Sequence, residues 1–107
     1  MTKSELRAVL RVPITQRGNL GVTSAWFPCL IRDFSSKGFL IKSATKFHVG
    51  DILELKSELY PERFLHCKIE VRHITDECLG TKIVEVTEEG SELCSQFIDE
   101  HISLKRF

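Results

Sequence analysis

The stretch IRDFSSKGFLI, residues 31–41, joins two short apolar segments through the polar sequence DFSSKG. Aromatic and branched side chains favour extended backbone on both sides of it, over residues 26–32 and 38–42. The polar sequence is typical of a turn, because Asp33 can close an Asx turn, serine hydroxyls can bond nearby backbone and Gly38 can take a positive φ. The stretch therefore predicts two neighbouring strands, and it raises the question whether their turn also binds a ligand.

Further strands are predicted over residues 52–58, 64–74 and 78–86. In the segment FLHCKIEVRHI, residues 64–74, apolar and polar side chains alternate along the chain. This alternation indicates a half-buried strand. Its inner face would carry Leu65, Cys67, Ile69 and Val71, and its outer face His66, Lys68, Glu70 and Arg72.

The end of the chain has the pattern of a helix over about residues 88–103. Thr87 can cap its first turn, and Glu88 and Glu89 suit the positive end of the helix dipole. Apolar residues recur on one side, at Leu93, Phe97, Ile98 and Ile102. Five or six short strands followed by one helix predict a mainly β protein, either an antiparallel barrel or a sandwich covered by the helix.

Length and composition are those of one ordinary globular domain. The chain has 107 residues, of which 42% are hydrophobic and 28% charged, and it contains no apolar run long enough to cross a bilayer. The N-terminal sequence MTKSELRAVLRV lacks the apolar core of a secretory signal. We therefore expect a cytoplasmic protein with no membrane association.

The cysteines and histidines do not have the spacing of a metal site. The four cysteines are scattered through the chain without a CxxC pair, at Cys29, Cys67, Cys78 and Cys94. Without close pairs a zinc site is not expected, and without an export signal disulfides are not expected either, so the thiols are predicted to be core residues. No nucleophile elbow or phosphate loop is found either, so we expect no catalytic activity and no metal or other cofactor.

Charge is distributed unevenly along the chain. Residues 1–42 contain seven basic and two acidic side chains, a formal +5, whereas residues 43–107 contain eight basic and thirteen acidic ones, a formal −5. The first part should therefore face any anionic ligand. The acidic remainder disfavours wrapping of a long DNA or RNA, which needs a broad positive stripe.

A two-part motif links the turn to the N-terminus. Arg7 and Arg11 form an RxxxR, and after 21 intervening residues Asp33, Ser35 and Gly38 form a DxSxxG. This arrangement resembles the PilZ family, bacterial receptor domains for the second messenger cyclic di-GMP. The segments FHVGDILEL and CLGTKIV also look like parts of that family's strands.

The resemblance implies a six-stranded antiparallel β-barrel of PilZ type with a C-terminal α-helix. Residues 1–12 would form a flexible arm that carries RxxxR, and residues 13–107 the barrel domain. Cyclic di-GMP would bind to Arg7, Arg11, Asp33, Ser35 and Gly38, as one ligand or as an intercalated pair. The ligand would order the arm and so change the binding of a downstream protein partner that the sequence does not identify.

Several neighbouring residues have two possible roles, a structural role or contact with the ligand. Ser36 and Lys37 are expected to be turn residues, with a ligand contact as the alternative. His73 lies seven residues before Gly80, where many family members carry tryptophan. Because His73 continues the apolar phase of residues 65–71, it is predicted to lie in the core or at a barrel end, with ligand contact as the alternative.

The other exposed or buried positions follow from residue type. Trp26 is expected to lie in the core, and Arg17 and Arg32 to be exposed on strands.

Two other functions fit the same composition. One is a PilZ-fold adaptor that binds proteins but no nucleotide, and the other is a small barrel that binds single-stranded nucleic acid, for which one Trp and one Tyr are few.

Overall fold

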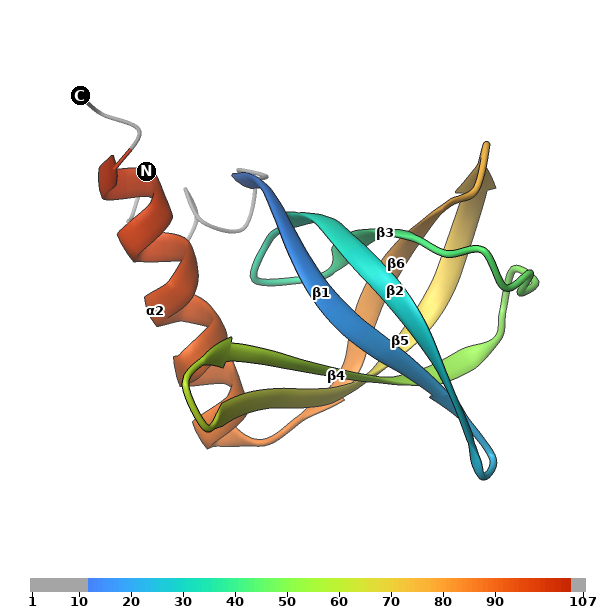
Figure 1. Cartoon of the computed structure of the whole chain (residues 1–107), viewed down its shortest axis with the longest axis horizontal. Coiled ribbons are helices and arrows are strands. Elements are labelled where there is room, and N and C mark those ends of the chain that lie inside the picture. The colour runs from blue at the N-terminus through green and yellow to red at the C-terminus, as the bar shows by residue number, and fades with distance from the viewer. Residues whose placement is uncertain (1–11, 105–107) are drawn as a thin grey trace.

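The computed structural model describes residues 12–104, which form a closed antiparallel barrel with a helix against one end (Figure 1). The strand order around the barrel is β1-β2-β3-β6-β5-β4. The predicted six-stranded barrel with a C-terminal helix is thus confirmed. Along the chain the elements are β1 (Val12–Val22), β2 (Ala25–Phe34), β3 (Phe39–Lys42), β4 (Ile52–Tyr60), β5 (Arg63–Thr75), β6 (Cys78–Val86) and α2 (Glu88–Leu104).

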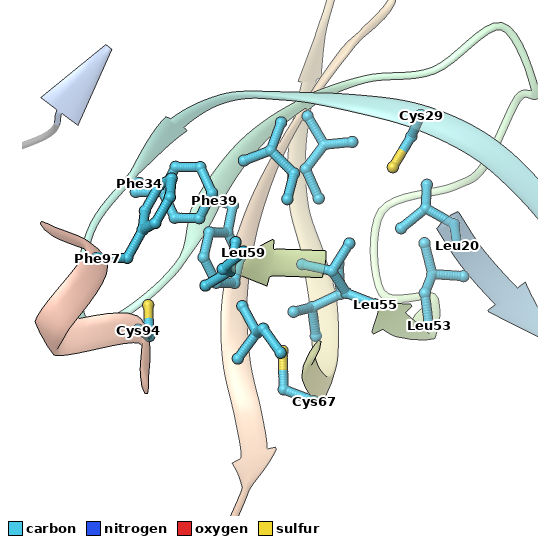
Figure 2. Close-up of a cluster of buried hydrophobic side chains, with 14 of the residues drawn as sticks. Leu20, Cys29, Phe34, Phe39, Leu53, Leu55, Leu59, Cys67, Cys94 and Phe97 are labelled. Atoms are coloured by element: carbon cyan, nitrogen blue, oxygen red, sulfur yellow. The ribbon is translucent and has the colours of Figure 1, made fainter. Parts of the chain in front are cut away.

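The core fills the barrel and continues under the helix (Figure 2). Leu20, Leu55 and Ile69 are fully buried inside the barrel. The alternation predicted for β5 is confirmed, since the side chains of Leu65, Cys67, Ile69 and Val71 are all buried.

The cysteines behave largely as predicted. Cys29, Cys67 and Cys94 are buried free thiols, whereas Cys78 is half-buried. Burial raises the pKa of Cys67 to about 12 and that of Cys29 to about 11. These thiols are therefore neutral at physiological pH and act as small apolar core groups.

Strand β1 has no counterpart among the strands predicted above, and it contains a proline and glycines, which disfavour a strand. The barrel explains them: a methyl group on Gly18 would lie 3.1 Å from the Lys56 carbonyl oxygen, and one on Gly21 would lie 2.8 Å from the ring of Trp26. The prediction that Trp26 lies in the core is wrong. Its side chain lies over Gly21 on the outer face and is 47% exposed.

Helix α2 begins where the sequence predicted. The Thr87 hydroxyl accepts a hydrogen bond from the Gly90 N–H at 3.0 Å, which is the expected N-cap. Leu93, Phe97 and Ile98 are buried against the barrel. Within residues 12–104, no helix combines the length and apolar character needed to cross a membrane.

Aromatic rings attach the helix to the barrel. The ring centroid of Phe97 lies 4.9 Å from that of Phe34 in β2 and 5.9 Å from that of Tyr60 in β4. The Tyr60 hydroxyl donates a 2.7 Å hydrogen bond to the Glu100 carboxylate. Partial burial and this hydrogen bond raise the pKa of Tyr60 to about 12.

Phe97→Ala should lower the free energy of unfolding by about 3–5 kcal/mol, the usual cost of removing a buried phenylalanine ring. Chemical denaturation monitored by circular dichroism measures this change. Gln96→Ala on the exposed side of the same helix is the matched control and should change stability by less than about 0.5 kcal/mol. Equal effects of the two variants would show that the Phe97 contacts do not hold the helix to the barrel.

Candidate functional site

The turn between β2 and β3 is held from inside by Ser35. The Ser35 hydroxyl donates to the Gly38 carbonyl oxygen at 3.0 Å and accepts from the Gly38 N–H at 3.1 Å and from the Lys37 N–H at 3.3 Å. The Ser35 backbone N–H also donates to the Gly38 carbonyl. Ser35 is buried, so its hydroxyl serves first to fix the turn, as the sequence allowed.

Gly38 is needed for a different reason from the one predicted. The φ angle of Gly38 is not in the left-handed region, which among the glycines of residues 12–104 only Gly50 adopts. Instead, a methyl group at Gly38 would collide with the carbonyl oxygen of Thr81 in β6. Next to this contact the Ile83 N–H donates to the Lys37 carbonyl at 2.7 Å. The turn is thereby pressed against β6.

A β-bulge directs Asp33 outward. Ile31 pairs with Ile41 and Asp33 with Leu40, so Arg32 is an extra residue in β2. Regular alternation would place Asp33 inside and Phe34 outside. Because the bulge shifts the phase by one residue, Asp33 lies on the outer face, Phe34 is fully buried and Arg32 is exposed, as expected for Arg32.

A second bulge does the same for His73. Val71 pairs with Thr81 and His73 with Gly80, so Arg72 is the extra residue in β5. The prediction of a core or barrel-end histidine is therefore wrong: His73 is exposed on the outer face. Its ring lies directly on Gly80, where a methyl group would collide with it.

The two bulges place Asp33 and His73 in one row across the barrel. Going from strand to strand, the paired residues are Pro13, Asp33, Leu40, Gly80 and His73. Residues opposite one another in antiparallel strands lie on the same face. Three strand spacings of about 4.8 Å separate Asp33 from His73, roughly 14 Å in all. Leu40 and Gly80 lie between them. Leu40 had no role in the sequence prediction, and Gly80 served there only to locate His73, because only strand pairing reveals their place.

The remaining predicted site residues fall into two groups. Ser36 and Lys37 are exposed at the tip of the turn. Arg7 and Arg11 lie outside the described residues. The start of β1 is described, however: Val12 pairs with Phe34 and Pro13 with Asp33. Figure 1 shows this strand end and the β2–β3 turn on the side of the barrel nearer α2.

The row and its turn form an open surface, with a carboxylate at one end and an imidazole at the other. Leu40, half-buried between them, offers an apolar contact. Across residues 12–104, no three His, Cys, Asp or Glu side chains are grouped closely enough to hold a metal ion.

The comparisons with known proteins agree with this architecture. The family model of the PilZ domain matches residues 4–100. The chain belongs to the PilZ family. A search of the curated proteins found no match.

Solved structures share the PilZ fold at low sequence identity. The inhibitor of motility MotI/DgrA of Bacillus subtilis superposes with a TM-score of 0.78 at 18% identity, covering 90% of this chain and 50% of that one. The PilZ domain of CeSA from a cellulose-synthesizing bacterium gives 0.64 at 11% identity, covering 90% and 98%. The PlzA protein of Borreliella burgdorferi, solved in complex with c-di-GMP, gives 0.61 at 20% identity, covering 92% and 38%. The chain thus spans about half the length of MotI/DgrA.

Gly38→Ala should destabilise this PilZ domain by at least about 1–3 kcal/mol, since the added methyl group meets backbone that cannot move without opening the β3–β6 contact. Gly80→Ala is the matched control, because the atoms nearest to its methyl group belong to the exposed side chain of His73 and not to backbone. It should change stability by less than about 0.5 kcal/mol and shift the His73 imidazole signals in NMR spectra. Equal destabilisation by both substitutions would contradict the assigned role of Gly38.

Proposed function

We propose that this chain is a receptor for cyclic di-GMP, which binds between the RxxxR segment and the outer face of the barrel at the DxSxxG turn. The observation that carries the proposal is the pairing of Val12 with Phe34 and of Pro13 with Asp33. The chain that bears Arg7 and Arg11 is therefore joined to the barrel directly beside the turn.

Chain length supports the same arrangement. Arg7 precedes Val12 by five residues, and five extended residues span at most about 17 Å. The distance along the row from Asp33 to His73 is roughly 14 Å. Arg7 can therefore reach along much of the row without a change in the barrel, whereas Arg11, one residue before Val12, is expected to stay near its Asp33 end, since one extended residue spans only about 3.5 Å.

The chemistry of the ligand matches the residue types. Cyclic di-GMP has two phosphates and two guanines. The guanidinium groups of Arg7 and Arg11 can grip phosphate with two hydrogen bonds, contact guanine O6 and N7, or stack on a purine. The Asp33 carboxylate offers two acceptors to the N1–H and 2-amino group of guanine. Leu40 adds an apolar contact for the base, and Lys37 adds positive charge at the tip of the turn.

His73 and Ser36 extend the site at its two ends. The His73 ring, held above Gly80, is placed to pack against a base that lies over Leu40. Ser36, exposed beside Lys37, can donate to a phosphate. The buried hydroxyl of Ser35 and the glycine at position 38 support the ligand through the shape of the turn. PlzA, a structural neighbour, was solved with c-di-GMP, which adds to the support for this ligand class.

The receptor acts as a clamp in this proposal and not as an enzyme. The ligand bridges the arm to the barrel, orders residues 1–12 and so changes the surface offered to a protein partner. Binding needs no cofactor and no nucleic acid, and the signal is the changed surface.

Calorimetric titration with cyclic di-GMP should show binding by the wild-type chain, and its stoichiometry distinguishes one ligand from an intercalated pair. Arg7→Ala and Arg11→Ala each remove charge-assisted hydrogen bonds and should weaken binding about tenfold to a hundredfold or abolish it. Asp33→Ala should weaken it while the fold is kept. Arg17→Ala, an exposed arginine of β1, is the matched control and should bind as the wild type does.

Absence of heat at high micromolar ligand would reject the receptor and leave the adaptor that binds no nucleotide. GTP in place of cyclic di-GMP should give no comparable signal. If an oligonucleotide binds instead, with a steep salt dependence, the single-stranded nucleic-acid function replaces the receptor.

Amide hydrogen exchange should detect the clamp directly. We expect residues 1–12 to gain protection when cyclic di-GMP is added, while β4, which contributes no residue to the turn or the row, keeps its exchange rates. The Asp33→Ala variant at the same ligand concentration is the control and should gain less protection. Equal exchange of residues 1–12 with and without ligand would contradict the clamp.

A further inference from the structure

A groove lies on the outer face of the barrel beside the row, where β1 and β4 separate. These strands pair only over residues 19–21 and 54–56. Beyond that point side chains bridge them: the Ser57 hydroxyl donates to the Arg17 carbonyl at 2.7 Å, and the Gln16 amide donates to the Glu58 carbonyl at 2.8 Å. The resulting open groove has a volume of about 740 Å³.

The floor and one wall of this groove are apolar. Gly18 contributes no side chain, Pro28 and Leu30 come from β2, and Phe64 stands at the β5 side. Phe64 is 49% exposed, although burial of its ring would be favourable. A partly exposed aromatic ring at the edge of a concave surface is the kind of anchor found in protein interfaces.

The rim of the groove is basic. Arg17, Lys42 and Lys56 line it together with one carboxylate, Glu58. The Lys56 ammonium lies 5.0 Å from the centroid of the Phe64 ring, which places positive charge beside the apolar wall. Among residues 12–104, no ion pair joins any of the three basic side chains to a carboxylate.

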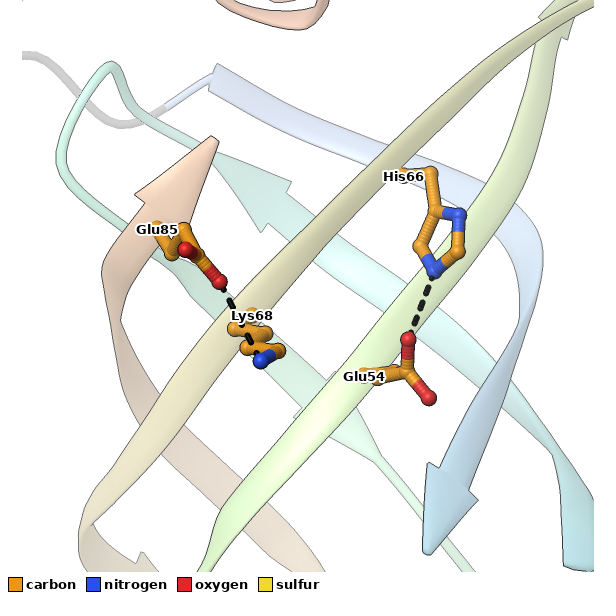
Figure 3. A network of polar contacts seen from close by, with 4 residues as sticks. All are labelled: Glu54, His66, Lys68 and Glu85. Atoms are coloured by element: carbon orange, nitrogen blue, oxygen red, sulfur yellow. Dashed lines mark hydrogen bonds and ion pairs between the residues drawn. The ribbon is translucent and has the colours of Figure 1, made fainter. Parts of the chain in front are cut away.

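On the neighbouring outer face, carboxylates lie beside basic side chains (Figure 3). The His66 imidazole lies 3.0 Å from the Glu54 carboxylate, and the Lys68 ammonium lies 3.2 Å from the Glu85 carboxylate. A surface of paired charges offers little to a charged partner, whereas the groove carries three cations against one anion. The electrostatic attraction of the groove is therefore toward acidic groups.

We infer that this groove binds an acidic linear segment of a partner protein, with an aromatic or aliphatic side chain inserted beside Phe64 and carboxylates on Arg17, Lys42 and Lys56. The inference deepens the proposed function, because it assigns the surface through which the receptor meets its partner. Single-stranded nucleic acid is disfavoured, since one exposed phenylalanine in the groove gives few bases a stacking platform and Glu58 repels phosphate.

The groove is connected to the turn through β2 and β3. Leu30 pairs with Lys42 at the groove, and Asp33 pairs with Leu40 at the row. Only the inward pair of Ile31 and Ile41 and the bulged Arg32 separate these two outward pairs. A ligand held at Asp33 therefore lies beside the end of the groove, where its charge and the ordered arm can favour or oppose docking.

Selection of random short peptides displayed on phage, with the wild-type chain as bait, tests the inference. Enriched peptides should carry several Asp or Glu around one aromatic or large aliphatic residue. Fluorescence anisotropy of the best peptide should then give weaker binding to Arg17→Glu, Lys42→Glu and Lys56→Glu, by about threefold to tenfold for each. Lys82→Glu, an exposed change on β6, is the matched control and should leave affinity unchanged.

Several outcomes would overturn the inference. One is enrichment of basic or uncharged peptides. Another is equal affinity of the three charge-reversed variants and the wild type for the selected peptide. A third is tighter binding of oligo-dT than of the peptide, if the same charge reversals abolish it. Thermal melting shows whether each variant is folded. Calorimetry with cyclic di-GMP separates the two proposals. Arg17→Glu should still bind cyclic di-GMP, because Arg17 lines the groove and not the row. If the wild-type chain itself binds no cyclic di-GMP, the receptor is rejected, and the peptide experiment still decides on the groove.

Discussion

The barrel depends on the close approach of Gly38 to Thr81. Strand β3 has only four residues and pairs with β6 at three positions, so closure there has few ladder hydrogen bonds. The contact adds to them: the Thr81 hydroxyl donates to the Phe39 carbonyl at 2.9 Å and accepts from the Phe39 N–H at 3.3 Å. A side chain at position 38 would prevent this approach, and the β3–β6 pairing that closes the barrel would be weakened.

The residues of the DxSxxG motif therefore have two different roles in this chain. The Ser35 side chain points into the fold, where its hydroxyl holds the turn together through hydrogen bonds to Gly38. Gly38 has no side chain and so leaves room for the close approach of β6. Asp33 points outward because of the bulge at Arg32. The three residues predicted alike as ligand contacts thus divide into one on the outer face and two that shape the turn. The bulge is the device that makes both orientations compatible in one short segment.

Particular residues show what the sequence could predict. The alternation from Leu65 to Val71 predicted β5, and Thr87 predicted the start of α2, because both signals are local. His73 was misplaced because a bulge leaves no mark in the alternation, so the phase was continued through Arg72. Trp26 was misplaced because its contact, Gly21, lies on the neighbouring strand. The row from Asp33 to His73 depends on pairing among four strands, which local patterns do not contain.

The position of Phe34 limits how the domain can respond to a ligand. Phe34 follows Asp33 directly, is fully buried, and packs on Phe39 at 5.4 Å and on Phe97 of α2 at 4.9 Å between ring centroids. Moving the turn would disturb this close-packed cluster, at a cost of several kcal/mol on the scale of about 3–5 for a lost ring. A few charge-assisted hydrogen bonds to a ligand contribute roughly 1.5–3 kcal/mol each. Moving the turn as well would cancel much of that binding free energy. The response is therefore expected in the segment before Val12 and in exposed side chains along the groove, while the barrel and α2 stay as they are.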